Sequence, residues 1–196
     1  MNIRFPSIFL ATFTVCAAVQ AQPCDYYTKY GTGGNPDKAL FMTIGKQCSI
    51  VVDEKGPRQV CTNRHENMRC LLANGANPNA VNSFDTPLMK AAALLAVESA
   101  RILIEYGADV NAKRSIDGKT PLMIAAMQSD HTLHPGNIPP HASGLVTPAT
   151  DMLRLLIEKG ADVNARDGAG MTALFHARST GHKESQKFLK AAGGTE

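Results

Sequence analysis

A ten-residue phrase occurs three times in this chain and constrains its fold more than any other feature. The copies read LLANGANPNA at 71–80, LIEYGADVNA at 103–112 and LIEKGADVNA at 156–165. A second phrase follows each copy and reads Thr86-Pro87-Leu88-Met89, Thr120-Pro121-Leu122-Met123 and Thr172-Ala173-Leu174-Phe175. Such self-similarity is typical of a repeat protein, in which each supersecondary unit buries its apolar face against the next.

The chemistry of these phrases predicts a helix pair in each unit. Threonine is a good helix N-cap, and proline at the next position supplies a helical φ where its missing N–H has no cost. We therefore expect helices to start at Thr86 and Thr120. The glycines Gly75, Gly107 and Gly160 follow apolar-periodic runs and suit the left-handed residue that ends a helix. One unit is then helix, short loop, helix and an extended turn.

At these residues the sequence resembles the ankyrin repeat family, whose signature includes T-P-L-H-x-A and G-A-D-V-N-A. The resemblance covers about residues 54–193 and implies an all-α ankyrin repeat solenoid of about four helix-pair repeats. One departure is that Met89, Met123 and Phe175 replace the histidine of T-P-L-H. In the family this histidine helps to tie one turn to the next, so apolar packing is expected to take over that role here.

The predicted organisation has three parts. Residues 1–21 read as a signal peptide, with Arg4, an apolar run at 8–18 and a cleavage site after Ala21. Residues 22–34 form an N-terminal extension. The ankyrin repeat domain spans 35–193, with repeats at about 35–80, 86–112, 120–165 and 172–193. The third repeat holds an insertion at 130–148, because its Thr120 and Gly160 are spaced more widely than the equivalent residues of its neighbours.

Removal of the signal peptide would leave four cysteines, and an even count in an exported chain favours disulfides over metal ligands. Two helices are predicted in the first repeat, from Asn35 to about Lys46 and from about Thr62 to Asn74, with a connector at 48–61 between them. In an antiparallel helix pair, this order favours Cys24–Cys70 with Cys48–Cys61, which would tie the N-terminal cap. Cys24–Cys61 with Cys48–Cys70 stays open, as do four free thiols.

Composition argues against several classes of function. The formal net charge of the exported chain would be +2, from 19 basic and 17 acidic residues, and no basic cluster points to nucleic acid. No nucleophile–base arrangement and no phosphate-binding loop can be recognised, so we expect neither an enzyme nor a cofactor. The apolar run of the signal peptide is too short to span a membrane.

The insertion offers the weak alternative of a metal site. It carries His131, His134 and His141 close to Asp130, and imidazole and carboxylate are good zinc ligands. Four prolines and the lack of a defined spacing favour instead a loop that decorates the binding surface. A long loop in a compact repeat is often functional.

The resemblance implies a protein partner, bound by the turn tips and the first helix of each repeat. The candidate contact residues share exposure at these places in the repeat; they are Phe84, Leu94, Lys113, Arg114, Ile116, Lys119, Met127, Met171 and the three loop histidines. An apolar row with Lys113, Arg114, Lys119 and Arg166 beside it would suit a partner with an acidic rim. Packing between repeats would equally explain the apolar side chains.

These expectations combine into an exported, non-catalytic protein-binding protein, periplasmic or secreted and monomeric when free. Its size and decorated loop favour an immunity or inhibitor protein that occludes a periplasmic toxin enzyme. The alternative is an accessory partner that stabilises a periplasmic enzyme handling oxidants.

Overall fold

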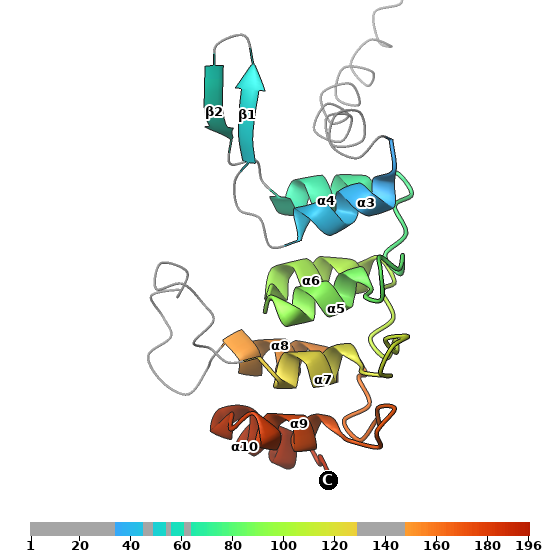
Figure 1. Ribbon diagram of the computed structural model, residues 1–196, viewed down its shortest axis with the longest axis vertical. Coiled ribbons are helices and arrows are strands. Elements are labelled where there is room, and N and C mark those ends of the chain that lie inside the picture. The colour runs from blue at the N-terminus through green and yellow to red at the C-terminus, as the bar shows by residue number, and fades with distance from the viewer. Residues whose placement is uncertain (1–33, 45–48, 54–55, 61–63, 129–147) are drawn as a thin grey trace, which may run out of the picture.

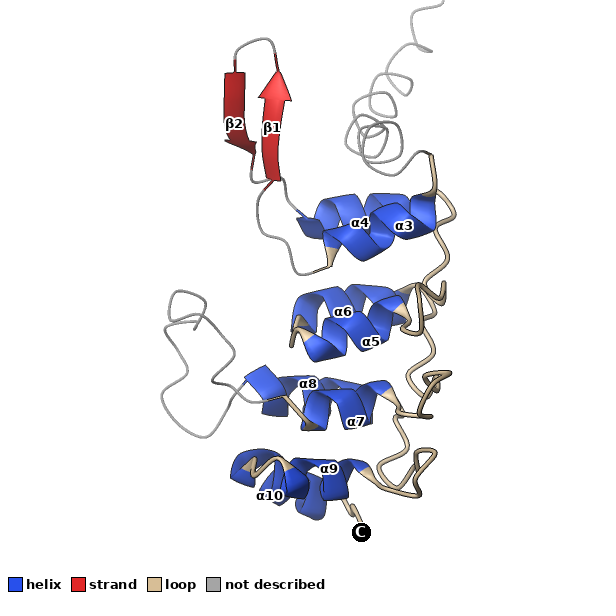
Figure 2. Cartoon of the chain, viewed as in Figure 1, coloured by secondary structure: helices blue, strands red, loops and turns tan. Residues whose placement is uncertain are grey.

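Four pairs of antiparallel helices stack into a solenoid in the computed structural model, which describes residues 34–44, 49–53, 56–60, 64–128 and 148–196 (Figure 1). The pairs are α3 (Pro36–Thr43) with α4 (Arg64–Ala73), α5 (Pro87–Ala93) with α6 (Val97–Glu105), α7 (Pro121–Ala126) with α8 (Pro148–Glu158), and α9 (Ala173–Ser179) with α10 (Lys183–Ala191). The helical solenoid and its helix pairs are confirmed. The extended turns all lie along one edge of the stack (Figure 2).

The threonine caps start the first helices of the second, third and fourth pairs. Thr86 Oγ1 accepts a hydrogen bond from the Met89 N–H at 3.3 Å, and Thr120 and Thr172 cap α7 and α9 in the same way. Asn35 caps α3, where its Oδ1 accepts hydrogen bonds from two backbone N–H groups of the first turn. The predicted helix starts are therefore confirmed, with a chemistry that depends only on local sequence.

Glycine ends the second helix of each of the first three pairs. Gly75, Gly107 and Gly160 have φ of +90°, +87° and +91°, a conformation in which a Cβ would be strained. The following N–H then closes the helix, as when the Ala108 N–H donates to the Leu103 carbonyl at 2.9 Å. The expected helix ends are confirmed.

The core lies between successive pairs and is built from the same repeat positions. Leu88, Leu122 and Leu174 of the first helices are 0%, 1% and 3% exposed. Equivalent leucines of the second helices, Leu103 and Leu156, are fully buried. Burial of each such side chain contributes about 1.5–3 kcal/mol, so the stack is stabilised mainly by contacts between neighbours.

The connector of the first pair, for which no regular structure was expected, contains a β-hairpin. Strands β1 (Ser49–Asp53) and β2 (Gly56–Val60) pair antiparallel, with Ser49 opposite Val60 and Asp53 opposite Gly56. The β-branched run Ile50-Val51-Val52 favours a strand over a loop. In Figure 1 the hairpin extends beyond the first helix pair, away from the rest of the stack.

Several expectations fall outside the described residues. The signal peptide, most of the N-terminal extension and the loop histidines belong to this group. The insertion is shorter than expected at one end, because Pro148 is already the first residue of α8. No helix in the described ranges is long and apolar enough to cross a membrane.

Candidate functional site

The candidate site is the edge of the solenoid formed by three turn tips, which we define as residues 81–85, 113–119 and 166–171. We call them the second, third and last tips, after the repeat whose first helix each one precedes. Phe84 and Ile116 occupy equivalent positions in the second and third repeats and are 50% and 58% exposed. Ala169 takes this position in the last tip. We call Phe84 and Ile116 the tip row. Large exposed apolar side chains at equivalent places on neighbouring tips are one feature of protein-docking surfaces.

The other predicted contact residues differ in how exposed they are and in where they lie along the helices. Leu94 follows α5 and is 47% exposed, whereas Met127, which follows α7, is half-buried. Met171 is also half-buried, and Lys113 is exposed. Leu94 and Met127 cap the C-terminal ends of their helices, and the tip row lies before the N-terminal ends. The structure therefore places the predicted residues on two ends of the first helices.

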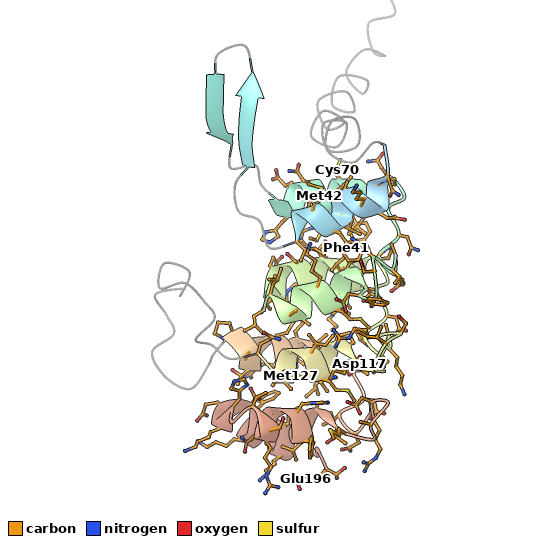
Figure 3. All side chains as sticks on the ribbon, in the orientation of Figure 1. Phe41, Met42, Cys70, Asp117, Met127 and Glu196 are labelled. Carbon is orange, nitrogen blue, oxygen red and sulfur yellow. The ribbon has the colours of Figure 1, made fainter. Side chains whose placement is uncertain are left out.

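Asp117 organises the third tip, at residues 113–119 (Figure 3). Its carboxylate accepts two hydrogen bonds from the Arg114 guanidinium, at 2.6 and 2.9 Å, and one from Lys119 Nζ at 2.6 Å. The hydrogen bond from Arg114 outweighs the opposing effect of burial and holds the pKa of Asp117 far below its usual range. The Arg114 and Lys119 charges are thus directed at Asp117, within the tip. Lys113 and Arg166 remain exposed at the edge.

Neighbouring tips are joined to one another. Arg114 Nη1 lies 3.5 Å from Asp85 of the second tip, and the Gly168 N–H of the last tip donates to the Asp117 carbonyl at 2.8 Å. A Cβ at Gly118 would lie 2.9 Å from the Gly168 nitrogen, so only glycine permits this approach. Charge and backbone contacts together hold the three tips in a fixed row.

The last tip has a buried polar centre that the sequence did not reveal. Asp167 Oδ2 lies 2.8 Å from His176 Nε2, and its Oδ1 accepts hydrogen bonds from the Ala169 and Met171 N–H groups at 2.9 Å. Burial alone would raise the pKa of Asp167, but these hydrogen bonds outweigh burial and lower it. His176 stands one position after Phe175, which replaces the family histidine, so the histidine is displaced by one residue.

The two other replacements are not purely apolar. Met89 Sδ lies 3.5 Å from the Thr86 nitrogen and accepts its hydrogen bond, and Met123 Sδ does the same for Thr120. A thioether is a weak acceptor, yet it completes a capping box at each tip. The expectation of packing alone was therefore incomplete.

A ladder of asparagine side chains links successive repeats beneath the tips. In each rung the asparagine Nδ2 donates to a helix-ending glycine carbonyl, and its Oδ1 accepts an N–H two residues further on. The rungs are Asn79 to Gly107 and Asp109, Asn111 to Gly160 and Asp162, and Asn164 to Gly193 and Thr195, at 2.7–3.2 Å. The Asn-Ala pair that ends every repeated phrase is the sequence signal that could have predicted this ladder.

Neither metal nor disulfide chemistry marks the tips. Among the described residues, no group of three or more His, Cys, Asp or Glu side chains could hold a metal ion. The loop histidines His131, His134 and His141 lie outside those residues. Cys70 on α4 is disulfide-bonded, and Cys24, Cys48 and Cys61 fall where the structure gives no description.

Comparison with known families agrees with this geometry. Two family descriptions, "Ankyrin repeats (3 copies)" and "Ankyrin repeats (many copies)", match residues 59–133 and 146–189, which together exceed half of the chain. The chain belongs to the ankyrin repeat family. The family resemblance inferred from the repeated phrases is therefore confirmed. Ankyrin repeats imply protein–protein binding.

Curated relatives match this chain over very different shares of their own length. The chain is 28% identical over 183 residues to alpha-latrocrustotoxin-Lt1a of Latrodectus tredecimguttatus, covering 86% of this chain and 12% of that protein. It is 34% identical over 113 residues to human ankyrin repeat and SOCS box protein 6, covering 55% and 22% respectively. Human cyclin-dependent kinase inhibitor 2A is 27% identical over 131 residues, covering 67% and 72%. The chain thus spans less than a quarter of the first two relatives.

Proposed function

We propose that this protein is an exported binding module that docks a protein partner on its turn tips. The observation that carries the proposal is the tip row, in which Phe84 and Ile116 remain half-exposed on tips that are joined to one another. A fixed apolar row avoids much of the entropy cost of ordering a loop on binding. Lys113 and Arg166 beside the row favour a partner that is apolar at its centre and acidic at its rim.

Export follows from the predicted signal peptide and from cysteine usage. Disulfides form in oxidising compartments, so the Cys70 disulfide supports a periplasmic or secreted protein. In the sequence Cys48 directly precedes β1 and Cys61 directly follows β2, an order that supports the pairing Cys48–Cys61. Cys24 would then be left for Cys70. Peptide mapping of the unreduced protein tests this assignment, and four alkylated thiols in the native protein would refute it.

The finer role that we favour is an immunity or inhibitor protein that occludes a periplasmic toxin enzyme. Its support is the small size of the solenoid and the insertion, which adds a loop to one repeat. A relative of similar extent is named as a kinase inhibitor, which supports an inhibitory role for this chain. The alternative is an accessory partner that stabilises an oxidant-handling enzyme. Loss of the captured enzyme's activity supports the first role, and a rise in its melting temperature without inhibition supports the second.

The test is capture of a partner with matched variants. Immobilised protein is incubated with exported-protein extract of the source organism, in parallel with the double variant Phe84→Ser/Ile116→Ser and the control Tyr106→Ser. Tyr106 is 39% exposed, ends α6 and belongs to none of the three tips. A protein retained by the parent and the control but lost from the double variant supports docking on the tips. Equal retention by all three would place the partner elsewhere.

Metal binding through the insertion is the remaining alternative. Asp130 and the three loop histidines could supply zinc ligands. Metal content of the purified protein decides this point, since stoichiometric zinc that disappears in His131→Ala would favour a metal protein.

A further inference from the structure

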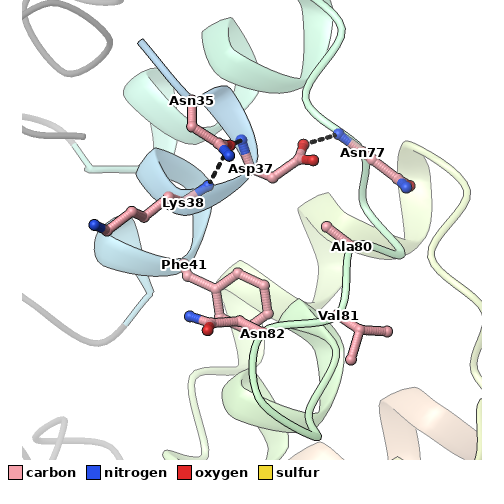
Figure 4. Close-up of a pocket in the computed structure, with 8 residues that line it drawn as sticks. All are labelled: Asn35, Asp37, Lys38, Phe41, Asn77, Ala80, Val81 and Asn82. Atoms are coloured by element: carbon pink, nitrogen blue, oxygen red, sulfur yellow. Dashed lines mark hydrogen bonds between the residues drawn. The ribbon is translucent and has the colours of Figure 1, made fainter. Parts of the chain in front are cut away.

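Two grooves beside the tips differ in charge. The groove beside α3 has one charged side chain of each sign among its described lining residues, Asp37 and Lys38 (Figure 4). The groove between the third and last tips has a volume of about 400 Å³, and its charged lining residues are two cations, Lys113 and Arg166, and one carboxylate, Asp162. The Asp162 carboxylate accepts a backbone N–H two residues further on, at 2.9 Å. The second groove therefore offers positive charge to a ligand.

Both cations of this groove are directed at main-chain oxygens and not at carboxylate side chains of the described ranges. Lys113 Nζ donates to the Arg166 carbonyl at 3.3 Å, and Arg166 Nη1 donates to the Gly170 carbonyl at 2.6 Å. A carbonyl oxygen carries only a partial charge, so these contacts orient the two side chains without neutralising them. The last tip thus keeps two oriented positive charges.

The C-terminal segment brings an acidic residue to the same place. Arg166 Nη2 donates to the main-chain oxygen of Glu196 at 3.1 Å. The Glu196 carboxylate forms an ion pair with Arg178 of α9. One glutamate therefore bridges the arginine of the last tip and the arginine of the helix that follows it. The bridge shows that these two guanidinium groups can be served by a single acidic residue.

The backbone before Glu196 is fixed, and this sets where the glutamate lies. Thr172 Oγ1 donates to the Thr195 carbonyl at 2.6 Å, and the Thr195 N–H donates to Asn164 Oδ1 at 2.7 Å. A Cβ at Gly194 would lie 2.8 Å from a backbone carbonyl oxygen, so glycine is needed for this path. The segment is therefore anchored up to Thr195, and the Glu196 side chain extends from that anchor.

Exposure decides how firmly Glu196 is held. The side chains of Arg178 and Glu196 are 63% and 50% exposed. An ion pair this exposed changes an equilibrium by only about two- to fivefold. A carboxylate that reaches the same guanidinium groups inside a protein interface is shielded from water, and its charge-assisted hydrogen bonds are stronger. Glu196 can therefore be displaced while Thr195 stays anchored.

We infer that Arg166 and Arg178 form a carboxylate-binding site, which Glu196 fills in the free protein and which a glutamate or aspartate side chain of the protein partner fills in the complex. The site rests on the proposed function for the source of its ligand, and it assigns the acidic rim of the partner to the last repeat. Lys113 of the adjoining groove adds to the attraction. Because every ligand competes with Glu196, acidic surfaces that match the site poorly are excluded.

NMR titration of the arginine Nε–H signals tests the site with a defined probe. The probe is the amidated peptide acetyl-Gly-Gly-Thr-Glu, which has the sequence of residues 193–196, and its control ends in glutamine. The glutamate peptide should shift the Arg166 and Arg178 signals and leave that of Arg101 on α6 unchanged. Its affinity should be about two- to fivefold higher for Glu196→Gln than for the parent, because the competing carboxylate is gone.

Glu184→Gln provides the matched control variant. It removes a carboxylate from another ion pair of the last repeat, that with Lys187 at 2.9 Å, and should bind the peptide as the parent does. Equal affinity of the parent and Glu196→Gln, or the same shifts with the glutamine peptide, would overturn the inference. The titration needs no protein partner, so that result would leave docking on the tip row standing. Failure of partner capture would in turn leave the peptide result unchanged.

Discussion

At the scale of single residues, Asp117 is the charge on which the third tip depends. Its carboxylate binds Arg114 and Lys119 within the tip. Arg114 also pairs with Asp85 of the second tip, and the Asp117 carbonyl accepts the Gly168 N–H of the last tip. Because the carboxylate is mostly buried, its loss would leave two cations with reduced compensation. The third tip should therefore be sensitive to pH and to substitution.

We predict that Asp117→Asn lowers the free energy of unfolding at pH 7 by about 1–2 kcal/mol, the range for a partly exposed charge-assisted hydrogen bond. The folded-state pKa is lowered from an unfolded value of about 3.9, so this stabilisation is complete above about pH 5. It is lost as the pH falls from there toward the folded pKa. Urea unfolding of parent and variant at pH 7 and pH 3 should show a difference that shrinks at the lower pH.

Glu158→Gln provides the control for this experiment. Glu158 is an exposed carboxylate at the end of α8, and its neutralisation should change stability by less than about 0.5 kcal/mol. An Asp117→Asn effect that equals that of Glu158→Gln at both pH values would contradict the account of the tip.

Met123 tests whether the thioether has a polar role. In Met123→Leu the volume is kept and the acceptor for the Thr120 N–H is removed. We expect a loss of about 0.5–1 kcal/mol in thermal or urea unfolding, in the range of a single modest hydrogen bond. No loss would mean that Met123 acts by packing alone, as the sequence had indicated.

At the scale of elements, local chemistry made most helices predictable. Threonine caps, Pro87 and Pro121 at helix starts, and the glycines at helix ends act within a few residues, so the sequence encodes them directly. The tip contacts and the asparagine ladder could not be located in this way, because each joins groups that lie 28 to 51 residues apart. The hairpin was missed because five-residue strands carry little periodic signal.

The ladder gives a prediction at this scale. Asn111→Ala removes two hydrogen bonds between the second and third repeats, at 3.0 and 2.8 Å, and should cost about 1–2 kcal/mol. Asn111→Asp keeps the acceptor for the Asp162 N–H and loses the donor to Gly160, so an intermediate loss is expected. Urea unfolding measures both, and equal stability of all three proteins would show that the ladder does not couple the repeats.

At the scale of the whole molecule, stacking of the repeats aligns equivalent tip positions along one edge. The side chains at these positions differ from repeat to repeat. Phe84, Ile116 and Leu94, which the sequence offered as contact residues or as packing between repeats, are exposed. The sequence could not show that Arg114 and Lys119 are directed at Asp117, since that depends on how the turn closes. The exposed positive charge at the tips is therefore smaller than the sequence implied and is concentrated in Lys113 and Arg166, whose side chains donate to backbone carbonyls.

The central claim is that a protein partner docks on the tip row, and partner capture with matched variants tests it most directly. Serine at both Phe84 and Ile116 removes the apolar centre of the row, and truncation of such central contacts typically costs 2 kcal/mol or more, about thirtyfold in affinity. We predict that the parent and Tyr106→Ser retain the same protein and that the double variant loses it while its melting temperature is unchanged. Retention of that protein by the double variant, or a fall in its melting temperature large enough to explain the loss, would contradict the claim.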